Sequence, residues 1–172
     1  MRVRVWLLLV VLSGCVGCDQ VSKRAASEWL SGAERLSYWA DTVRLTYTEN
    51  HGAFLGLGAT WTEPVRWWVF TVLSSLLVLG ALLYAIRQTV QSRREWTSTL
   101  ALALVAAGGI GNLIDRFTRD GAVVDFMNLG IGSLRTGIFN VADVQIMLGF
   151  GLLLLWPPRP NPSDAPTPHP SG

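Results

Sequence analysis

The sequence is poor in charged residues, in cysteine and in histidine, and each shortage excludes a class of protein. Charged residues make up 15% of the chain, whereas an ordinary soluble domain has about 25%. Two cysteines cannot form a disulfide framework, and the two histidines, His51 and His169, do not suggest a metal site. A formal net charge of +2 is too small to indicate nucleic-acid binding. Half of the 172 residues are hydrophobic and the mean hydropathy is +0.35, so the composition predicts a membrane protein.

Four apolar blocks predict four membrane-spanning helices. A helix needs about 20 mostly apolar residues to cross a bilayer, and residues 67–86 and 96–114 reach that length unaided. Residues 5–18 and 144–156 form shorter blocks, which need polar neighbours to complete a span. The predicted fold class is an all-α integral membrane protein built as a four-transmembrane-helix bundle.

The two short blocks bring polar residues into the membrane. The first reaches spanning length by extending into Asp19, and the last by starting near Ile138. That start places Asn140 and Asp143 in the first turns of the last span. Carboxylates inside a membrane helix are costly, and they are therefore candidates for function.

The number of spans predicts where the polar candidates meet. With four spans, the ends of spans 1 and 3 and the starts of spans 2 and 4 lie on one face of the membrane. The polar residues at those positions are Asp19, Asn50, Asp115, Asp125 and Asp143. We expect them to converge at that face.

Charge and tryptophan positions orient the spans. The short basic segment at residues 87–95 and the arginines before the first span place both termini in the cytoplasm, although the acid-rich side holds more basic residues in total. We assign one domain to residues 1–156 and a disordered Pro-rich tail to residues 157–172. The tryptophans near the ends of the spans resemble an aromatic belt: Trp61, Trp67, Trp68, Trp96 and Trp156.

The polar segment at residues 20–64 is too long for a simple connector and predicts an extramembrane platform. Residues 21–30 can form a short amphipathic helix, and the alternation around Val43 to Tyr47 predicts a strand. Residues 51–58 then form a Gly-rich turn. We expect the platform to lie over the acidic cluster.

Two carboxylates at the membrane edge suggest a specific chemistry. Asp125 lies in the apolar run 122–127 and Asp143 in the run 139–147, so both would be partly desolvated. Two such groups within hydrogen-bonding range share one proton, so that one activates water while the other polarises a carbonyl. This is aspartic proteolysis. The alternative is that each aspartate caps a helix or pairs with an arginine, the candidates being Arg116, Arg119 and Arg135.

Five short blocks of sequence then carry a resemblance to a known family. They are DQVSK at 19–23, NHGAF at 50–54, AAGGIGNLIDR at 106–116, VVDF at 123–126 and FNVAD at 139–143. In this order, with four spans among them, they resemble the signature blocks of the lipoprotein signal peptidase family (signal peptidase II) over about residues 5–156. The resemblance implies an intramembrane aspartyl endopeptidase of the bacterial inner membrane. It would remove signal peptides from prolipoproteins by cutting before a diacylglyceryl-modified cysteine, close to the periplasmic face. It also implies that the platform is a small β-cradle with a short helix.

The resemblance assigns roles to residues by their match to the motifs. Asp125 and Asp143 would form the catalytic dyad. Supporting or substrate-binding positions would be Asp19, Lys23, Asn50, Gly108, Asn112, Asp115, Arg116 and Asn140. No metal or other cofactor is implied, the partners would be prolipoproteins and membrane lipids, and we expect a monomer.

Several of these residues have a second, purely structural interpretation. Asn140 could orient a carboxylate or cap a helix, and Asp115 could form an ion pair with the adjacent Arg116. Lys23 could meet a lipid phosphate or Asp19, or extend to the membrane interface. The glycines of the third span, Gly108, Gly109 and Gly111, would allow close helix packing.

One stretch departs from the family pattern. The family often has a Trp-Pro or similar pair shortly before the FNVAD block, and Thr136-Gly137-Ile138 stands there in this chain. The departure concerns the loop that enters the last span and leaves both aspartates in place.

Three other functions fit parts of the sequence. Residues 1–17 resemble a lipoprotein signal peptide with a lipobox ending at Cys15, which would make the chain a substrate. The acidic cluster could serve a small proton or cation transporter. A family paralogue could also bind prolipoproteins without cutting them. Cys15 and Cys18 form a C-x-x-C pair without a thioredoxin-like context, so redox chemistry is not indicated.

Overall fold

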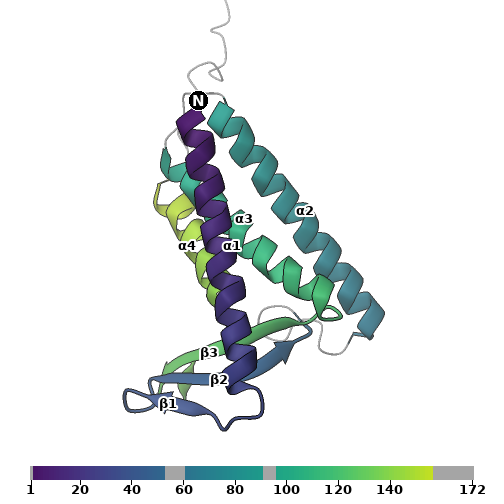
Figure 1. Cartoon of the computed structure of the whole chain (residues 1–172), viewed down its shortest axis with the longest axis vertical. Helices are drawn as coiled ribbons and strands as arrows, with labels where there is room; N and C mark the ends of the chain where they lie inside the picture. Colours follow the sequence, from purple (N-terminus) through teal and green to yellow (C-terminus); the bar gives the residue numbers. More distant parts are fainter. Residues whose placement is uncertain (1, 53–60, 91–95, 157–172) are drawn as a thin grey trace, which may run out of the picture.

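The computed structural model describes residues 2–52, 61–90 and 96–156. The predicted tail and most of the predicted Gly-rich turn lie outside these residues. In chain order the elements are α1 (Arg2–Leu30), β1 (Leu36–Tyr38), β2 (Val43–Asn50), α2 (Glu63–Val90), α3 (Trp96–Thr118), β3 (Val123–Ile131), β4 (Leu134–Arg135) and α4 (Val141–Leu155). The helices form an elongated bundle with a small sheet across one end, and the N terminus lies at the other end (Figure 1).

Three of the helices are long and apolar enough to cross a membrane, through Val5–Leu30, Glu63–Arg87 and Trp96–Thr118. The fourth, α4, is a shorter apolar helix of 15 residues, which corresponds to about 22 Å at 1.5 Å per residue. It begins at Val141, so the predicted start near Ile138 is wrong. Phe139 instead forms a β-bridge with Met127, and Asn140 keeps an extended backbone as the N-cap of α4.

The predicted amphipathic helix at residues 21–30 is not a separate element. It is the last part of α1, which continues without a break to Leu30. Lys23, Ala26 and Leu30 are buried on one side of this part, at a spacing that places them on one helical face. Ala26 and Leu30 pack against Phe126 of β3 and hold the end of α1 on the sheet.

The sheet is antiparallel with the order β1-β2-β3-β4. The strand predicted around Val43 to Tyr47 is confirmed as β2. Its partner β3 places Asp125 opposite Thr48, after an irregularity in register between Leu45 and Thr48. The sheet therefore joins the segment after α1 to the segment after α3.

The glycines of α3 allow close packing, as predicted, and each faces a different helix. A Cβ atom at Gly108 would meet Ala142 and Ile146 of α4. One at Gly109 would meet Val78 of α2, and one at Gly111 would meet the carboxyl group of Asp19 on α1. The helix α3 is therefore the centre of the bundle, in contact with the other three.

We expect Gly108→Ala to lower the free energy of unfolding by about 1–3 kcal/mol, because the added methyl group would be forced against packed atoms. Its Cβ atom would lie 2.8 Å from Cγ1 of Ile146. Thermal unfolding in detergent measures the effect.

The matched control for this substitution is Gly80→Ala in α2, where no described atom lies within 4 Å of an added Cβ. There the loss of glycine flexibility should stabilise the helix by about 0.5–1 kcal/mol. Equal melting temperatures for the two variants would contradict the packing argument.

Candidate active site

A cavity of about 580 Å³ opens where the sheet meets the ends of α3 and α4. Polar and charged groups gather at one part of its wall, and apolar side chains of α4 continue it. The lining residues are Asn50, Gly52, Asn112, Arg116, Val123, Asp125, Arg135, Thr136, Gly137, Ile138, Phe139, Asp143, Val144, Met147 and Leu148. Five of the predicted site residues therefore line one cavity, and one of them, Asn50, comes from β2.

Asp125 reaches the cavity from β3 and is only 3% exposed. One carboxylate oxygen, Oδ1, accepts a hydrogen bond from Nδ2 of Asn140 at 2.7 Å, and Oδ2 accepts one from Nδ2 of Asn50 at 2.9 Å. Burial is the main reason that the pKa of Asp125 rises to about 6, and the nearby charge of Asp143 adds to the rise against the opposing effect of the two amides. The group is thus able to hold a proton near neutral pH.

Asp143 lies in the first turn of α4, where the cap of the helix fixes its position. Asn140 and Asp143 form a capping box: Oδ1 of Asn140 accepts from the Asp143 amide at 3.0 Å, and Oδ2 of Asp143 accepts from the Asn140 amide at 3.1 Å. The other oxygen, Oδ1, accepts from Nδ2 of Asn112 at 3.0 Å. Both carboxylate oxygens of Asp143 are therefore held by amide donors.

Asn140 fulfils both of its predicted roles at once. Its side-chain oxygen caps α4, and its side-chain nitrogen donates to Asp125 and, at 3.2 Å, to Oδ1 of Asn112. The side chain is fully buried. One residue therefore links the carboxyl group on the strand to the carboxyl group on the helix.

Behind the cavity, Lys23 is buried in a network of ion pairs. Its ammonium group lies 2.9 Å from Oδ2 of Asp19 and 3.0 Å from Oδ2 of Asp115. It also donates to Oδ1 of Asn112 at 2.9 Å. Since Lys23 is 1% exposed, the predictions of a lipid phosphate contact and of extension to the interface are wrong, whereas the pairing with Asp19 is confirmed.

The predicted ion pair between Asp115 and Arg116 is not the one that forms. Asp115 instead pairs with Lys23 and accepts a hydrogen bond from the backbone amide of Val124 at 3.0 Å. Neighbours on a helix point in different directions, about 100° apart. Asp115 consequently connects α1 and α3 to the strand residue next to Asp125.

Arg116 faces the cavity and brings positive charge close to Asp125 and Asp143. Its Nε atom is buried and has no hydrogen-bond partner within the described residues. The other two arginines that were candidates for pairing with the aspartates have different acidic neighbours: Arg119 lies 3.9 Å from Glu49, and Arg135 lies 3.8 Å from Asp41.

Two polar residues that support the site are not singled out by the sequence patterns. Gln20 donates to Asp19, to the Gly111 carbonyl and to Asp115 at 3.1–3.2 Å, and the signals that point to it are its place beside Asp19 and within the DQVSK block. Gln145 donates to the Cys15 carbonyl on α1 at 2.9 Å. The only sequence signal for Gln145 is that it is a lone amide in an apolar block, and this signal does not predict its partner on α1.

The stretch that departs from the family pattern also lines the cavity. Thr136, Gly137 and Ile138 lie between β4 and α4. Nδ2 of Asn128 donates to the Thr136 carbonyl at 2.6 Å and so holds the start of this stretch on β3. The residues that differ are therefore part of the cavity wall.

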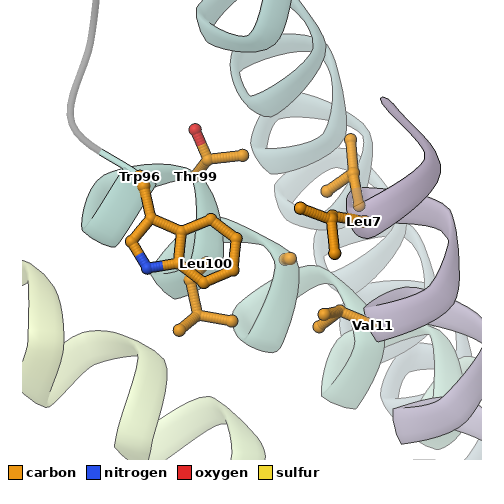
Figure 2. Close-up of a pocket in the computed structure, with 7 residues that line it drawn as sticks. Leu7, Val11, Trp96, Thr99 and Leu100 are labelled. Atoms are coloured by element: carbon orange, nitrogen blue, oxygen red, sulfur yellow. The ribbon is translucent and has the colours of Figure 1, made fainter. Parts of the chain in front are cut away.

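A second, much smaller pocket lies at the opposite end of the bundle. It has about 20 Å³ and is lined by α1 and α3, with Leu7, Val11, Trp96, Thr99 and Leu100 facing it (Figure 2). It holds no ionisable side chain. We therefore place the candidate active site in the large cavity. Among the described residues, no group of three His, Cys, Asp or Glu side chains is placed to hold a metal ion.

Comparisons with known proteins agree with the motifs. The profile of the signal peptidase (SPase) II family matches residues 10–157. The lipoprotein signal peptidase of Brevibacillus brevis is 32% identical over 150 residues, which cover 87% of this chain and 93% of the relative. That of Xylella fastidiosa is 34% identical over 165 residues, which cover 92% of each chain.

Solved structures show the same fold. A bacterial membrane enzyme determined by the in meso method at 2.3 Å resolution superposes with a TM-score of 0.74 over 88% of this chain and 87% of the other. A second one, at 1.9 Å resolution, gives a TM-score of 0.72 over 88% and 92%. The sequence identities are 22% and 21%. Together with the apolar helices, this likeness identifies a multi-pass membrane protein.

Proposed function

Because the chain belongs to the signal peptidase II family of proteases, we propose that it is an intramembrane aspartyl endopeptidase that cleaves the signal peptide from prolipoproteins. The cut would fall just before a diacylglyceryl-modified cysteine. The observation that carries the proposal is the pair of carboxyl groups of Asp125 and Asp143, which line one cavity from two different elements and are each held by two amide donors.

The two carboxyl groups have different roles in the attack of water on the substrate. Asp125 holds the proton, because burial raises its pKa to about 6. Asp143, ionised, takes a proton from water while the water oxygen attacks the scissile carbonyl carbon, and Asp125 gives its proton to the carbonyl oxygen. As the carbon–nitrogen bond breaks, Asp125 recovers a proton from the tetrahedral intermediate and Asp143 gives one to the leaving nitrogen.

The apolar wall of the cavity suits a substrate that arrives from the lipid. After Asp143, α4 contributes Val144, Met147 and Leu148 to the cavity wall, and these side chains are 38%, 64% and 57% exposed. An apolar signal peptide can lie along this strip with its scissile bond beside the carboxyl groups. We place the protein in the bacterial inner membrane, with the sheet and the cavity at the periplasmic side.

The direct test is cleavage of a diacylglyceryl-modified prolipoprotein by the purified chain, with the cut located by mass spectrometry. We expect wild type to cut before the lipidated cysteine and a folded Asp143→Asn variant to be silent. Cleavage by both Asp143→Asn and Asp125→Asn would overturn the dyad.

The same purified protein can distinguish the three alternative functions. Binding of the prolipoprotein without cleavage would identify a non-catalytic paralogue, and proton flux into liposomes that is lost in Asp143→Asn would identify a transporter. Loss of the residues before Cys15 from the intact mass would identify the chain as a substrate.

The rate should depend on pH in the direction set by Asp125. The productive state needs its proton, so kcat/KM is expected to fall by up to about tenfold per pH unit as the pH rises through about 6. Initial rates between pH 5 and pH 9 with a short substrate measure this limb. A rate that increases throughout this range would contradict the assignment of the proton to Asp125.

A further inference from the structure

The helix that carries Asp143 contains one more polar residue, and that residue points the other way. Among the 15 residues of α4, Asp143 and Gln145 are the only ones with charged or amide side chains. Side chains two residues apart on a helix point in directions about 200° apart. Asp143 accordingly lines the cavity, whereas Gln145 is 7% exposed and faces the interior of the bundle.

Among the described residues, Gln145 forms one of two hydrogen bonds that join α4 to α1. Its Nε2 atom donates to the Cys15 carbonyl at 2.9 Å, and the backbone amide of Ala142 donates to Oδ1 of Asp19 at 2.8 Å. The partners on α1 are four residues apart and those on α4 three, so the two bonds lie one helical turn apart. In sequence they enclose Asp143.

Stability does not explain this glutamine. Its Oε1 atom is buried and has no hydrogen-bond partner in the part of the chain that the structure describes. A buried acceptor without a donor is unfavourable, and more so within a membrane. An apolar side chain of similar size would fill the space without that cost.

The rest of the buried face of α4 is smooth. It consists of Ala142 and Gly149 beside Gln145, and Gly149 packs closely against the backbone of α3, its added Cβ lying 2.6 Å from the Ala101 carbonyl oxygen. Small residues allow close approach but give little resistance to rotation. A directional hydrogen bond between helices selects one rotation, as single buried polar residues do in helical assemblies.

We propose that Gln145 is a positioning residue that fixes the rotation of α4 against α1, and through it the direction in which Asp143 presents its carboxyl group to the cavity. The inference rests on the proposed function of Asp143 as half of the dyad. Asp125 belongs to a strand and does not follow a rotation of α4. A rotation would therefore change the distance between the two carboxyl groups, and misplacement of a reacting group by about 1 Å can cost up to about 100-fold in rate.

The test compares Gln145→Leu with wild type, using the full chain in detergent and the diacylglyceryl-modified substrate. We expect kcat to fall about tenfold, KM to stay within about twofold, and the melting temperature to stay equal or rise. Because the distance between Asp143 and Asp125 would change, the alkaline limb of the kcat profile should shift along the pH axis. Unchanged kcat and an unchanged pH profile would overturn the proposal, as would a loss of rate that only follows a loss of folded protein.

Thr71→Val is the matched control. Like Gln145→Leu, it removes a buried oxygen without a partner among the described residues, but here the oxygen is the hydroxyl of a residue in α2. It should leave kcat and the pH profile unchanged. A loss of rate equal to that of Gln145→Leu would show a general response to altered packing and would overturn the proposal.

Gln145→Glu gives a second readout that does not require a leucine at this position. Protonated glutamic acid can still donate to the Cys15 carbonyl, whereas the ionised form cannot. The rate relative to wild type should therefore be highest at low pH and fall as the pH rises, and a ratio independent of pH would overturn the proposal. Cleavage by wild type together with silence of Asp143→Asn decides the proposed function separately from all of these results.

Discussion

Asp125→Asn is expected to lower the cleavage rate by about 1,000-fold and at the same time to make the protein relatively more stable as the pH rises. The loss of rate follows because asparagine has no proton to give to the scissile carbonyl. The gain in stability follows from the cost of holding a charge at this position. Catalysis and stability thus place opposite demands on one side chain.

The sign of the stability change comes from the pKa of Asp125, which burial raises to about 6 from an ordinary value of 3.8. Below about pH 4 the group is largely neutral in the folded and unfolded states. Above about pH 6 it is ionised in both, and the folded state pays for a buried charge. Since one pKa unit corresponds to about 1.4 kcal/mol, the difference in unfolding free energy, variant minus wild type, should increase by up to about 3 kcal/mol from pH 4 to pH 8.

Unfolding of both proteins in detergent across this pH range measures the difference. The variant lacks one of the two amide hydrogen bonds to this side chain at every pH. The change of the stability difference with pH therefore reports only the ionisation of Asp125. Asp41→Asn is the control, because hydrogen bonds from Arg44 and Ser37 lower the pKa of Asp41, so that its difference from wild type should stay nearly constant between pH 4 and pH 8. Parallel pH dependence for Asp125→Asn and wild type would contradict the buried-charge argument.

Lys23→Met is expected to destabilise the protein by about 3–5 kcal/mol, because it removes the only cation in contact with two buried carboxylates, Asp19 and Asp115, among the described residues. Asp19 is fully buried and Asp115 is 3% exposed, so water cannot replace the ammonium group. The loss also frees Asn112, which donates to Asp143. We therefore expect little folded protein, and low activity in what remains.

Arg119→Met is the matched control for this prediction. Arg119 and Glu49 lie 3.9 Å apart with side chains 34% and 44% exposed, and an exposed pair of this kind contributes about 1 kcal/mol or less. Denaturation of the two variants under the same conditions compares them. If Lys23→Met melted as Arg119→Met does, the network would not be the structural centre of the site.

The meeting of the acids could be predicted from the sequence because it depends only on the number of spans. Asp115 and Asp143 lie near helix ends, and Asp19 lies where the apolar block of α1 stops, at positions that any four-span arrangement brings to one face. The partners of those acids could not be predicted in the same way. Whether Asp115 pairs with Arg116 or Lys23 depends on helix rotation, which apolar blocks leave open.

The surroundings of Asp125 could not be predicted for a different reason. The segment is apolar on both sides of the aspartate, because β3 packs between α1 and the end of α3, and continuous burial removes the alternation that marks a strand. Its pairing with β2 spans about 75 residues, beyond the range of local patterns. The apolar pattern also predicts too early a start for α4, because Phe139 pairs with β3 and the helix begins only after it.

The pairing of β2 with β3 has a consequence for the making of this protein. The two strands lie on either side of α2 and α3 in the chain, so the sheet can close only after both helices have entered the membrane. The last of the described helices, α4, then completes the site with Asp143. A nascent chain that stops before α4 carries the sheet, the Lys23 network and Asp125, but it lacks Asp143. If Asp125 and Asp143 form the proposed dyad, we expect no cleavage by a nascent chain before α4 has been made.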